Sequence, residues 1–122
     1  QGVSIGVSER SAYDLWLSDN FKSAKIVRAP SIQASHALFW DNKVDVLASL
    51  KPKLVEEIDN RGGVRLIEKP FTAIKQSIGL PKGSQNSVAY INQVIRSSIQ
   101  EGWLLDRLNY HGMASSLGIP LY

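Results

Sequence analysis

Cysteine is absent from the 122 residues, and histidine occurs only twice. Without cysteine the chain cannot form disulfides, thiolate metal sites or a cysteine nucleophile. No stretch approaches the roughly 18 consecutive apolar residues that a membrane-spanning helix needs. The 14 basic residues exceed the 11 acidic ones, but they are dispersed and form no stripe interleaved with aromatic residues. We therefore expect neither a transmembrane segment nor a nucleic-acid partner.

The chain begins at "QGVSIGV" (1–7), within a strand-like run and without an initiator methionine. We interpret it as mature, truncated or processed material and expect a signal peptide in the precursor, so the absence of a signal peptide here does not argue for the cytoplasm. With 43% hydrophobic and 20% charged residues, the composition is that of an ordinary globular protein. The length suits one domain or a piece of a larger protein.

Short apolar, β-branched runs alternate with helical patterns over the first part of the chain. The runs at 3–7, 24–29, 44–49 and 64–68 predict strands, and the apolar spacing between them predicts helices. The order βαβαβαβ predicts an α/β fold with a mostly parallel sheet, flanked by helices and built with right-handed crossovers.

A different pattern follows the stretch "KPFTA" (69–73). A longer extended stretch at 71–80 leads to two amphipathic helical patterns, which Gly102 and Gly112 are expected to end. We therefore divide the chain into residues 1–72 and residues 73–122.

Small polar residues follow the first strand, where α/β proteins place ligand groups beside helix N-termini. In "SERS" (8–11), the hydroxyls of Ser8 and Ser11 and the backbone N–H groups could hold an anion. Arg10 could add a bidentate contact to a carboxylate. The alternative is that Ser11 only caps the next helix, with Asp14 three residues later as in a capping box.

Two further strand ends carry hydroxyl groups. Ser31, in "APS" (29–31), is interpreted mainly as a helix N-cap. Ser49 and Lys51, in "ASLK" (48–51), could line a cleft or simply mark the end of a strand. All three remain candidate ligand-binding residues.

Catalytic patterns are weak. His36 and His111 fall on different predicted helices, and neither is expected at a strand end. Glu56, Glu57 and Asp59 are interpreted as a solvated helix face. No His, Asp or Glu spacing suggests a metal site, and no phosphate-loop or nucleophile-elbow motif is present. We therefore expect no enzyme activity, no metal and no cofactor.

The order of these motifs resembles the C-terminal half of bacterial extracellular solute-binding proteins of family 3, which feed ABC importers. Three segments carry the resemblance: "IGVSERSAYDLWL" (5–17), "NKVDVLASL" (42–50) and "IEKPFTAIKQSIGLPKGSQNSVAYINQVIRSSIQEGWLLDRLNYHG" (67–112). It implies a periplasmic-binding-protein-like fold of type II, with two lobes that clamp a solute. Residues 1–72 would form the second lobe. Residues 73–122 would supply a hinge strand and the closing helices of the first lobe, whose N-terminal half is absent.

The resemblance also implies a few site residues. The family often has a Gly-Thr pair after the first strand of this lobe, and the matching positions here are Arg10 and Ser11. It often has an aspartate that pairs with the solute α-ammonium, and the matching position is Leu50, beside Ser49. Because leucine cannot pair with an ammonium group, we expect the solute not to be an ordinary α-amino acid. Gln76, on the returning strand, would face the cleft.

Three hypotheses follow. The first is a non-enzymatic, periplasmic solute-binding component of an ABC importer. Its partners are a small polar or anionic solute, a membrane permease, and a second copy or a complementing chain that covers the closing helices. The second is a dehydratase-type enzyme on the same fold, for which Glu9 is the one carboxylate near the cleft. The third is the ligand-sensing domain of a signalling protein.

Overall fold

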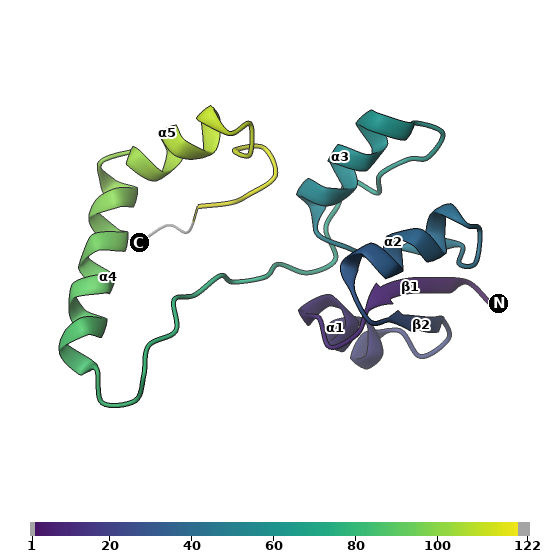
Figure 1. Ribbon diagram of the computed structural model, residues 1–122, viewed down its shortest axis with the longest axis horizontal. Coiled ribbons are helices and arrows are strands. Elements are labelled where there is room, and N and C mark those ends of the chain that lie inside the picture. The colour runs from purple at the N-terminus through teal and green to yellow at the C-terminus, as the bar shows by residue number, and fades with distance from the viewer. Residues whose placement is uncertain (1, 120–122) are drawn as a thin grey trace. The chain divides into compact units, whose positions relative to one another are not determined.

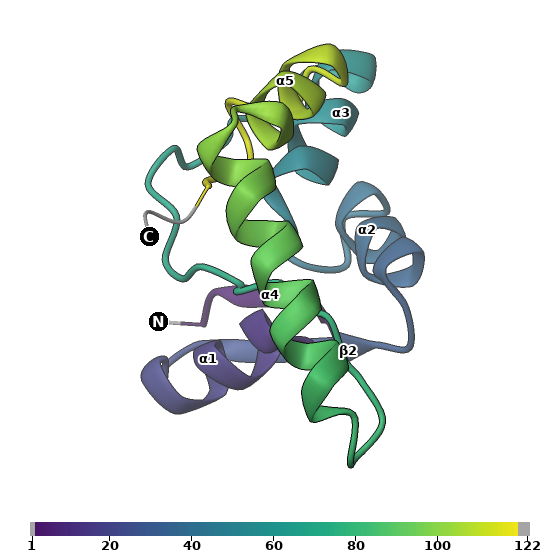
Figure 2. The same ribbon diagram turned by 90° about the vertical axis from the view of Figure 1, so that its left-hand side faces the viewer.

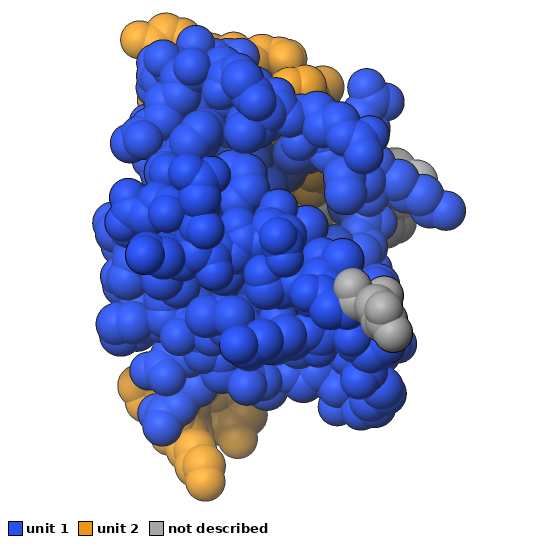
Figure 3. All heavy atoms as spheres, turned by 90° about the vertical axis from the view of Figure 1, so that its right-hand side faces the viewer, with its two compact units in different colours: residues 1–74 blue, residues 75–122 orange. Residues whose placement is uncertain are grey.

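The computed structural model describes residues 2–119 of a chain that divides into two compact units, residues 1–74 and residues 75–122 (Figure 3). Unit 1 is a small α/β arrangement, and unit 2 contains two helices (Figure 1). The division falls close to the boundary that we expected after residue 72.

Unit 1 is built on three parallel strands (Figure 1). Strand β1 (Ser4–Ser8) lies in the centre, with β2 (Lys25–Ala29) on one side and β3 (Val46–Leu47) on the other. Helix α1 (Ala12–Asn20) connects β1 to β2, and α2 (Ile32–Trp40) connects β2 to β3. The predicted α/β class with a parallel sheet is confirmed over these strands.

One side of β1 carries the hydrophobic core of unit 1. Ile5 and Val7 alternate along the strand and pack with Tyr13 and Leu17 of α1 and with Ala48. Alternate residues of a strand point to the same face of the sheet. Ile5 and Val7 therefore determine which face of the sheet α1 covers.

The residue between them, Gly6, allows a close approach on the other face. A Cβ atom at Gly6 would lie 3.0 Å from Val44 Cγ2 and 3.6 Å from the carbonyl oxygen of Ser35 in α2. Ser35 itself is completely buried. The small residue in the central strand therefore lets the backbone of α2 lie directly against the sheet.

Local sequence signals account for the helix starts. Ser11 and Ser31 are the N-caps of α1 and α2, and their hydroxyls accept from the N–H groups of Asp14 and Ala34. Helix α3 (Lys51–Arg61) begins with a proline in its first turn, which loses no helical hydrogen bond there. The predicted helix starts at Ser11 and Ser31 are thus confirmed.

Two predicted strands are wrong. Residues 64–68 and 71–80 form no strand in the described part of the chain. Gly62 and Gly63 both have positive φ, 66° and 75°, and turn the chain at the end of α3. An extended segment becomes a strand only when a neighbouring strand accepts its hydrogen bonds, and neither segment has such a neighbour among residues 2–119.

Unit 2 contains α4 (Gln85–Gln100) and α5 (Trp103–Tyr110), which contact each other (Figure 2). Gly102 joins them with φ of 79°, a left-handed conformation that glycine adopts without a steric penalty. No residue of either helix is buried. The apolar side chains that give α4 its amphipathic pattern are therefore left without an internal core.

Candidate functional site

The strand order of unit 1 indicates where a ligand would bind. With the order β2-β1-β3, the chain leaves β1 towards one neighbour and arrives at β3 on the other side. Ligands in open α/β sheets bind beyond the carboxyl ends of the strands at such a switch point. Residues 8–11 follow β1 and residues 48–51 follow β3. Residues 29–31 follow β2, the other neighbour of β1, so the switch point itself is flanked by the first and third of the predicted strand-end segments.

The turn after β1 is held in a specific conformation. Glu9 donates its backbone N–H to the Ala29 carbonyl of β2 at 2.9 Å, and its side chain is exposed. Ser11 both caps α1 and donates its hydroxyl to the Ser8 carbonyl at 2.7 Å. Only one acceptor position of the Ser11 hydroxyl is left for a ligand.

Arg10 occupies the left-handed region, with φ of 59°. Asparagine, aspartate and above all glycine tolerate this region, whereas arginine is strained in it. The resemblance had matched Arg10 to a glycine of the family, and the backbone conformation here is the one that glycine favours. The cation is exposed and lies at the switch point.

Replacing Arg10 with glycine is expected to stabilise unit 1 by up to about 1 kcal/mol, because the strain of the left-handed backbone is removed. Urea denaturation compares this variant with Arg10→Ala, which removes the same cation but keeps the Cβ atom. A glycine variant no more stable than the alanine variant would contradict the assignment of strain.

The buried carboxylate of Asp14 is hydrogen-bonded to the backbone of the same turn. Asp14, only 3% exposed, accepts from the Arg10 backbone N–H at 2.9 Å and from Arg28 Nε at 3.0 Å. Burial raises the pKa of Asp14, but the hydrogen bonds from Arg28 and Arg10 and the charge of Arg28 outweigh it, so the pKa lies below its ordinary value. The ionised carboxylate therefore holds the strained turn in place.

The other predicted ligand-binding residues lie in several different elements. Ser31 caps α2, which was the main interpretation of this residue. Leu50 is the N-cap of α3 without a side-chain hydrogen bond and is 37% exposed, and Lys51 begins the helix. Gln76 belongs to unit 2 and is exposed.

Ser49 has a partner that the sequence did not reveal. Its Oγ lies 2.8 Å from Nε2 of His36, which projects from α2 and is 3% exposed. Nδ1 of the same ring lies 2.9 Å from Oε2 of Glu57 in α3, an ion-pair distance that does not meet the geometry of a hydrogen bond. Trp40 Nε1 donates to the same carboxylate oxygen at 2.6 Å.

Two sequence interpretations are wrong at this cluster. Glu57 does not belong to a solvated face, because its side chain is only 18% exposed and contacts His36 and Trp40. Burial raises the pKa of Glu57, but the hydrogen bond from Trp40 and the nearby His36 and Lys53 outweigh it, so the pKa lies below its ordinary value. His36 lies beside the end of β3, although we expected no histidine at a strand end.

The helical pattern gave only a weak signal for the burial of His36. We expected Ala34, Leu38 and Phe39 to form the inner face of α2, but the buried residues of the helix are Ser35 and His36. Position 35 lies between Leu38 and Phe39 on the helical wheel, whereas position 36 lies about 60° beyond Phe39. A buried histidine at the edge of an apolar face requires polar partners, which the sequence alone cannot name.

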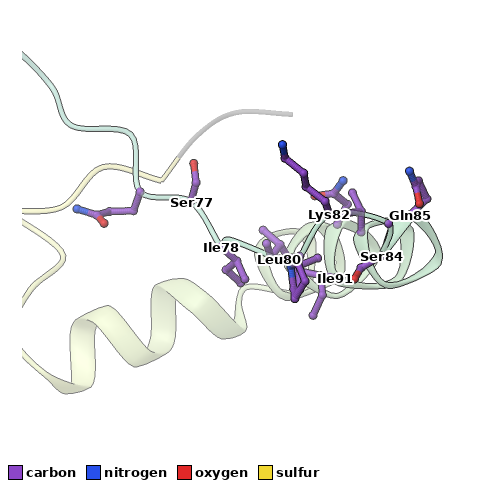
Figure 4. A pocket seen from close by; sticks show the side chains of 13 residues that line it. Ser77, Ile78, Leu80, Lys82, Ser84, Gln85 and Ile91 are labelled. Atoms are coloured by element: carbon purple, nitrogen blue, oxygen red, sulfur yellow. The ribbon is translucent and has the colours of Figure 1, made fainter.

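Each unit also has an open hollow. One, of about 420 Å³, lies within unit 2 and is lined by residues 76–85 and one face of α4 (Figure 4). The other, of about 540 Å³, lies in unit 1 between the end of α2 and residues 62–64. Asp45 lines it, but its carboxylate accepts from the backbone N–H and the hydroxyl of Ser4. These hydrogen bonds link the start of β1 to the residue before β3, so we assign Asp45 a structural role.

Comparison with known proteins finds no family model, curated protein or solved structure that matches the chain. Among residues 2–119, no group of three or more His, Asp or Glu side chains is placed to hold a metal ion. In the same residues, no helix combines the length and the apolar character required to cross a bilayer.

Proposed function

We propose that the chain is the second lobe, with the closing helices of the first lobe, of a type II periplasmic solute-binding protein that serves an ABC importer. The arrangement at the β1/β3 switch point carries the proposal. Two polar turns, residues 8–11 and 48–51, follow neighbouring parallel strands, and each leads directly into a helix. Backbone N–H groups at helix N-termini favour anionic groups.

The charges around the switch point favour an anionic solute. Arg10 supplies an exposed cation on one turn, and Lys51 supplies a second cation on the other. Leu50, at the position where relatives of the resembled family carry a carboxylate, gives an α-ammonium group no partner. A small carboxylate without an α-ammonium group is therefore the solute class that suits these residues.

The state of unit 2 fits the same proposal. All buried residues in the described chain precede residue 49, and α4 and α5 leave Val88, Val94 and Trp103 between 42% and 57% exposed. Exposed apolar surfaces of this kind are usually covered by a partner. We propose that the remainder of the first lobe, or a second copy of the chain, covers them.

A thermal-shift screen of the complete two-lobed protein tests the proposal. Small mono- and dicarboxylates are expected to raise the melting temperature, because a ligand at a hundred times its Kd stabilises a protein by about 2.7 kcal/mol. Free α-amino acids are expected to give little or no shift. Arg10→Ala should lower the shift that carboxylates cause.

The matched control is Lys43→Ala, which removes an exposed cation from the loop before β3, at the opposite end of the strands. This variant should keep the carboxylate shift. Strong stabilisation by α-amino acids would overturn the interpretation of Leu50. Equal losses in the two variants would show that overall charge, and not the switch point, determines binding.

A further inference from the structure

Three side chains from separate segments meet at the end of β3. Ser49 follows the strand, His36 comes from α2, and Glu57 comes from the second turn of α3. The distances are 2.8 Å from Ser49 Oγ to His36 Nε2 and 2.9 Å from His36 Nδ1 to Glu57 Oε2. The two ring nitrogens of one histidine thus contact a hydroxyl on one side and a carboxylate on the other.

The surroundings determine which nitrogen carries the proton. The carboxylate of Glu57 cannot donate when ionised, so we assign the proton of the neutral ring to Nδ1. Nε2 then has a free lone pair and accepts from the hydroxyl of Ser49. Trp40 holds Glu57 in position through the 2.6 Å bond from Nε1. Burial of the ring keeps this tautomer away from competing water.

We propose that Ser49 is an activated nucleophile, with His36 as its general base and Glu57 as a positioning residue. A hydroxyl, an imidazole and a carboxylate in this order activate serine for acyl transfer on unrelated folds. Here Ser49 and His36 are hydrogen-bonded, and Glu57 lies at ion-pair distance from Nδ1, from where a small rotation of the ring would align the two groups. Ser49 is half-buried and stands between a strand and a helix, where a nucleophile is accessible. The substrate class is small acyl esters.

A backbone donor stands beside the serine. The N–H of Leu50, the next residue, makes no backbone hydrogen bond within residues 2–119. In hydrolases with a strand-to-helix nucleophile, the N–H that follows the nucleophile stabilises the negative oxygen of the intermediate. This inference concerns reactivity and does not depend on the proposed solute binding.

The reaction balances without a further reactant except water. Ser49 Oγ forms a bond to the ester carbonyl carbon while its proton moves to His36 Nε2. The carbon–oxygen bond to the leaving group then breaks, and the departing alkoxide takes that proton from Nε2. Water attacks the acyl group with His36 again as base, which releases a carboxylic acid and restores the hydroxyl of Ser49.

Labelling with diisopropyl fluorophosphate tests the nucleophile directly. Ser49 Oγ would form a bond to phosphorus, the phosphorus–fluorine bond would break, and His36 would take the hydroxyl proton. Mass spectrometry of peptides from the whole chain, prepared as the folded protein, should find one diisopropylphosphoryl group, on Ser49. The internal control is Ser18, which is also half-buried and bonded to Arg28 but has no histidine near it.

Variants separate chemistry from structure. His36→Ala should slow the labelling of Ser49 by about 10²–10⁴-fold, the usual contribution of a general base, and added imidazole should restore part of the rate. Glu57→Gln, which keeps an acceptor for Trp40, should slow it by roughly tenfold or more, and Glu57→Asp should recover part of that loss. Circular dichroism checks that each variant remains folded.

The wild-type result alone can overturn the proposal. If Ser49 in the folded wild-type chain is labelled no faster than Ser18, the cluster is a structural link between α2 and α3. Equal labelling rates in wild type, His36→Ala and Glu57→Gln would overturn it as well. Slow release of p-nitrophenol from p-nitrophenyl acetate, lost in Ser49→Ala, would extend it from labelling to turnover.

Discussion

Truncating Leu17 to alanine is expected to lower the free energy of unfolding of unit 1 by about 3 kcal/mol. The side chain is 3% exposed and packs in the single cluster that joins α1 to the central strand. Its loss removes apolar contacts and leaves a cavity that Val7 and Tyr13 fill only in part. Urea denaturation followed by tryptophan fluorescence measures the change, in a Trp103→Phe background that leaves only Trp16 and Trp40, both in unit 1.

The control lies two residues earlier on the same helix. Leu15 is 61% exposed, so Leu15→Ala should change the free energy of unfolding by no more than about 0.5 kcal/mol. The two substitutions remove the same atoms from the same helix and have the same effect on helix propensity. Equal losses in the two variants would show that α1 does not cover the sheet through Leu17.

Removing the carboxylate of Asp14 is expected to cost about 2–3 kcal/mol at neutral pH. Asp14→Ala leaves the Arg10 backbone N–H and the Arg28 side chain without their shared acceptor. Arg28 can turn to water because its side chain is 47% exposed, which keeps the loss below that of a fully buried pair. Asp19→Ala, at an exposed position of the same helix, is the control and should have little effect.

The free energy of unfolding that is lost in Asp14→Ala should also depend on pH. The pKa of Asp14 is lower in the folded chain than its ordinary value, which is about 3.9 in an unfolded chain. A depressed carboxyl pKa stabilises the fold above the unfolded value, and this stability is lost as the pH falls through the folded value. The difference between wild type and Asp14→Ala should therefore be largest near neutral pH and shrink below about pH 4. A difference that grows on acidification would contradict the assignment.

The local structure of unit 1 was largely predictable. Serine at positions 11 and 31 marks two helix starts, because its hydroxyl satisfies backbone donors within a few residues along the chain. The alternation of apolar runs and helical patterns predicted that the first three strands are parallel, which is confirmed. These features depend on interactions between residues that are close in sequence, or on a period that the sequence displays.

The failures all involve partners that are distant in sequence. Residues 64–68 have the composition of a strand, but a strand needs a neighbour, and composition does not supply one. The face of α2 was misjudged because Ser35 and His36 are polar residues that are buried by a close backbone approach and by distant polar partners. Glu57 was misjudged for the same reason, since two neighbouring acidic residues on a helix usually face water.

The sequence by itself determined the α/β class, the caps and the absence of cysteine chemistry, because each depends on residue type and short-range spacing. The tertiary structure alone decided that Ser49, His36 and Glu57 meet, although they are separated by 13 and 21 positions along the chain. It likewise placed Arg28 on Asp14, 14 residues away. Contacts between residues so far apart in sequence form only when the strands pair and the helices pack on the sheet. The periodic pattern of the sequence does not predict which of these residues will meet.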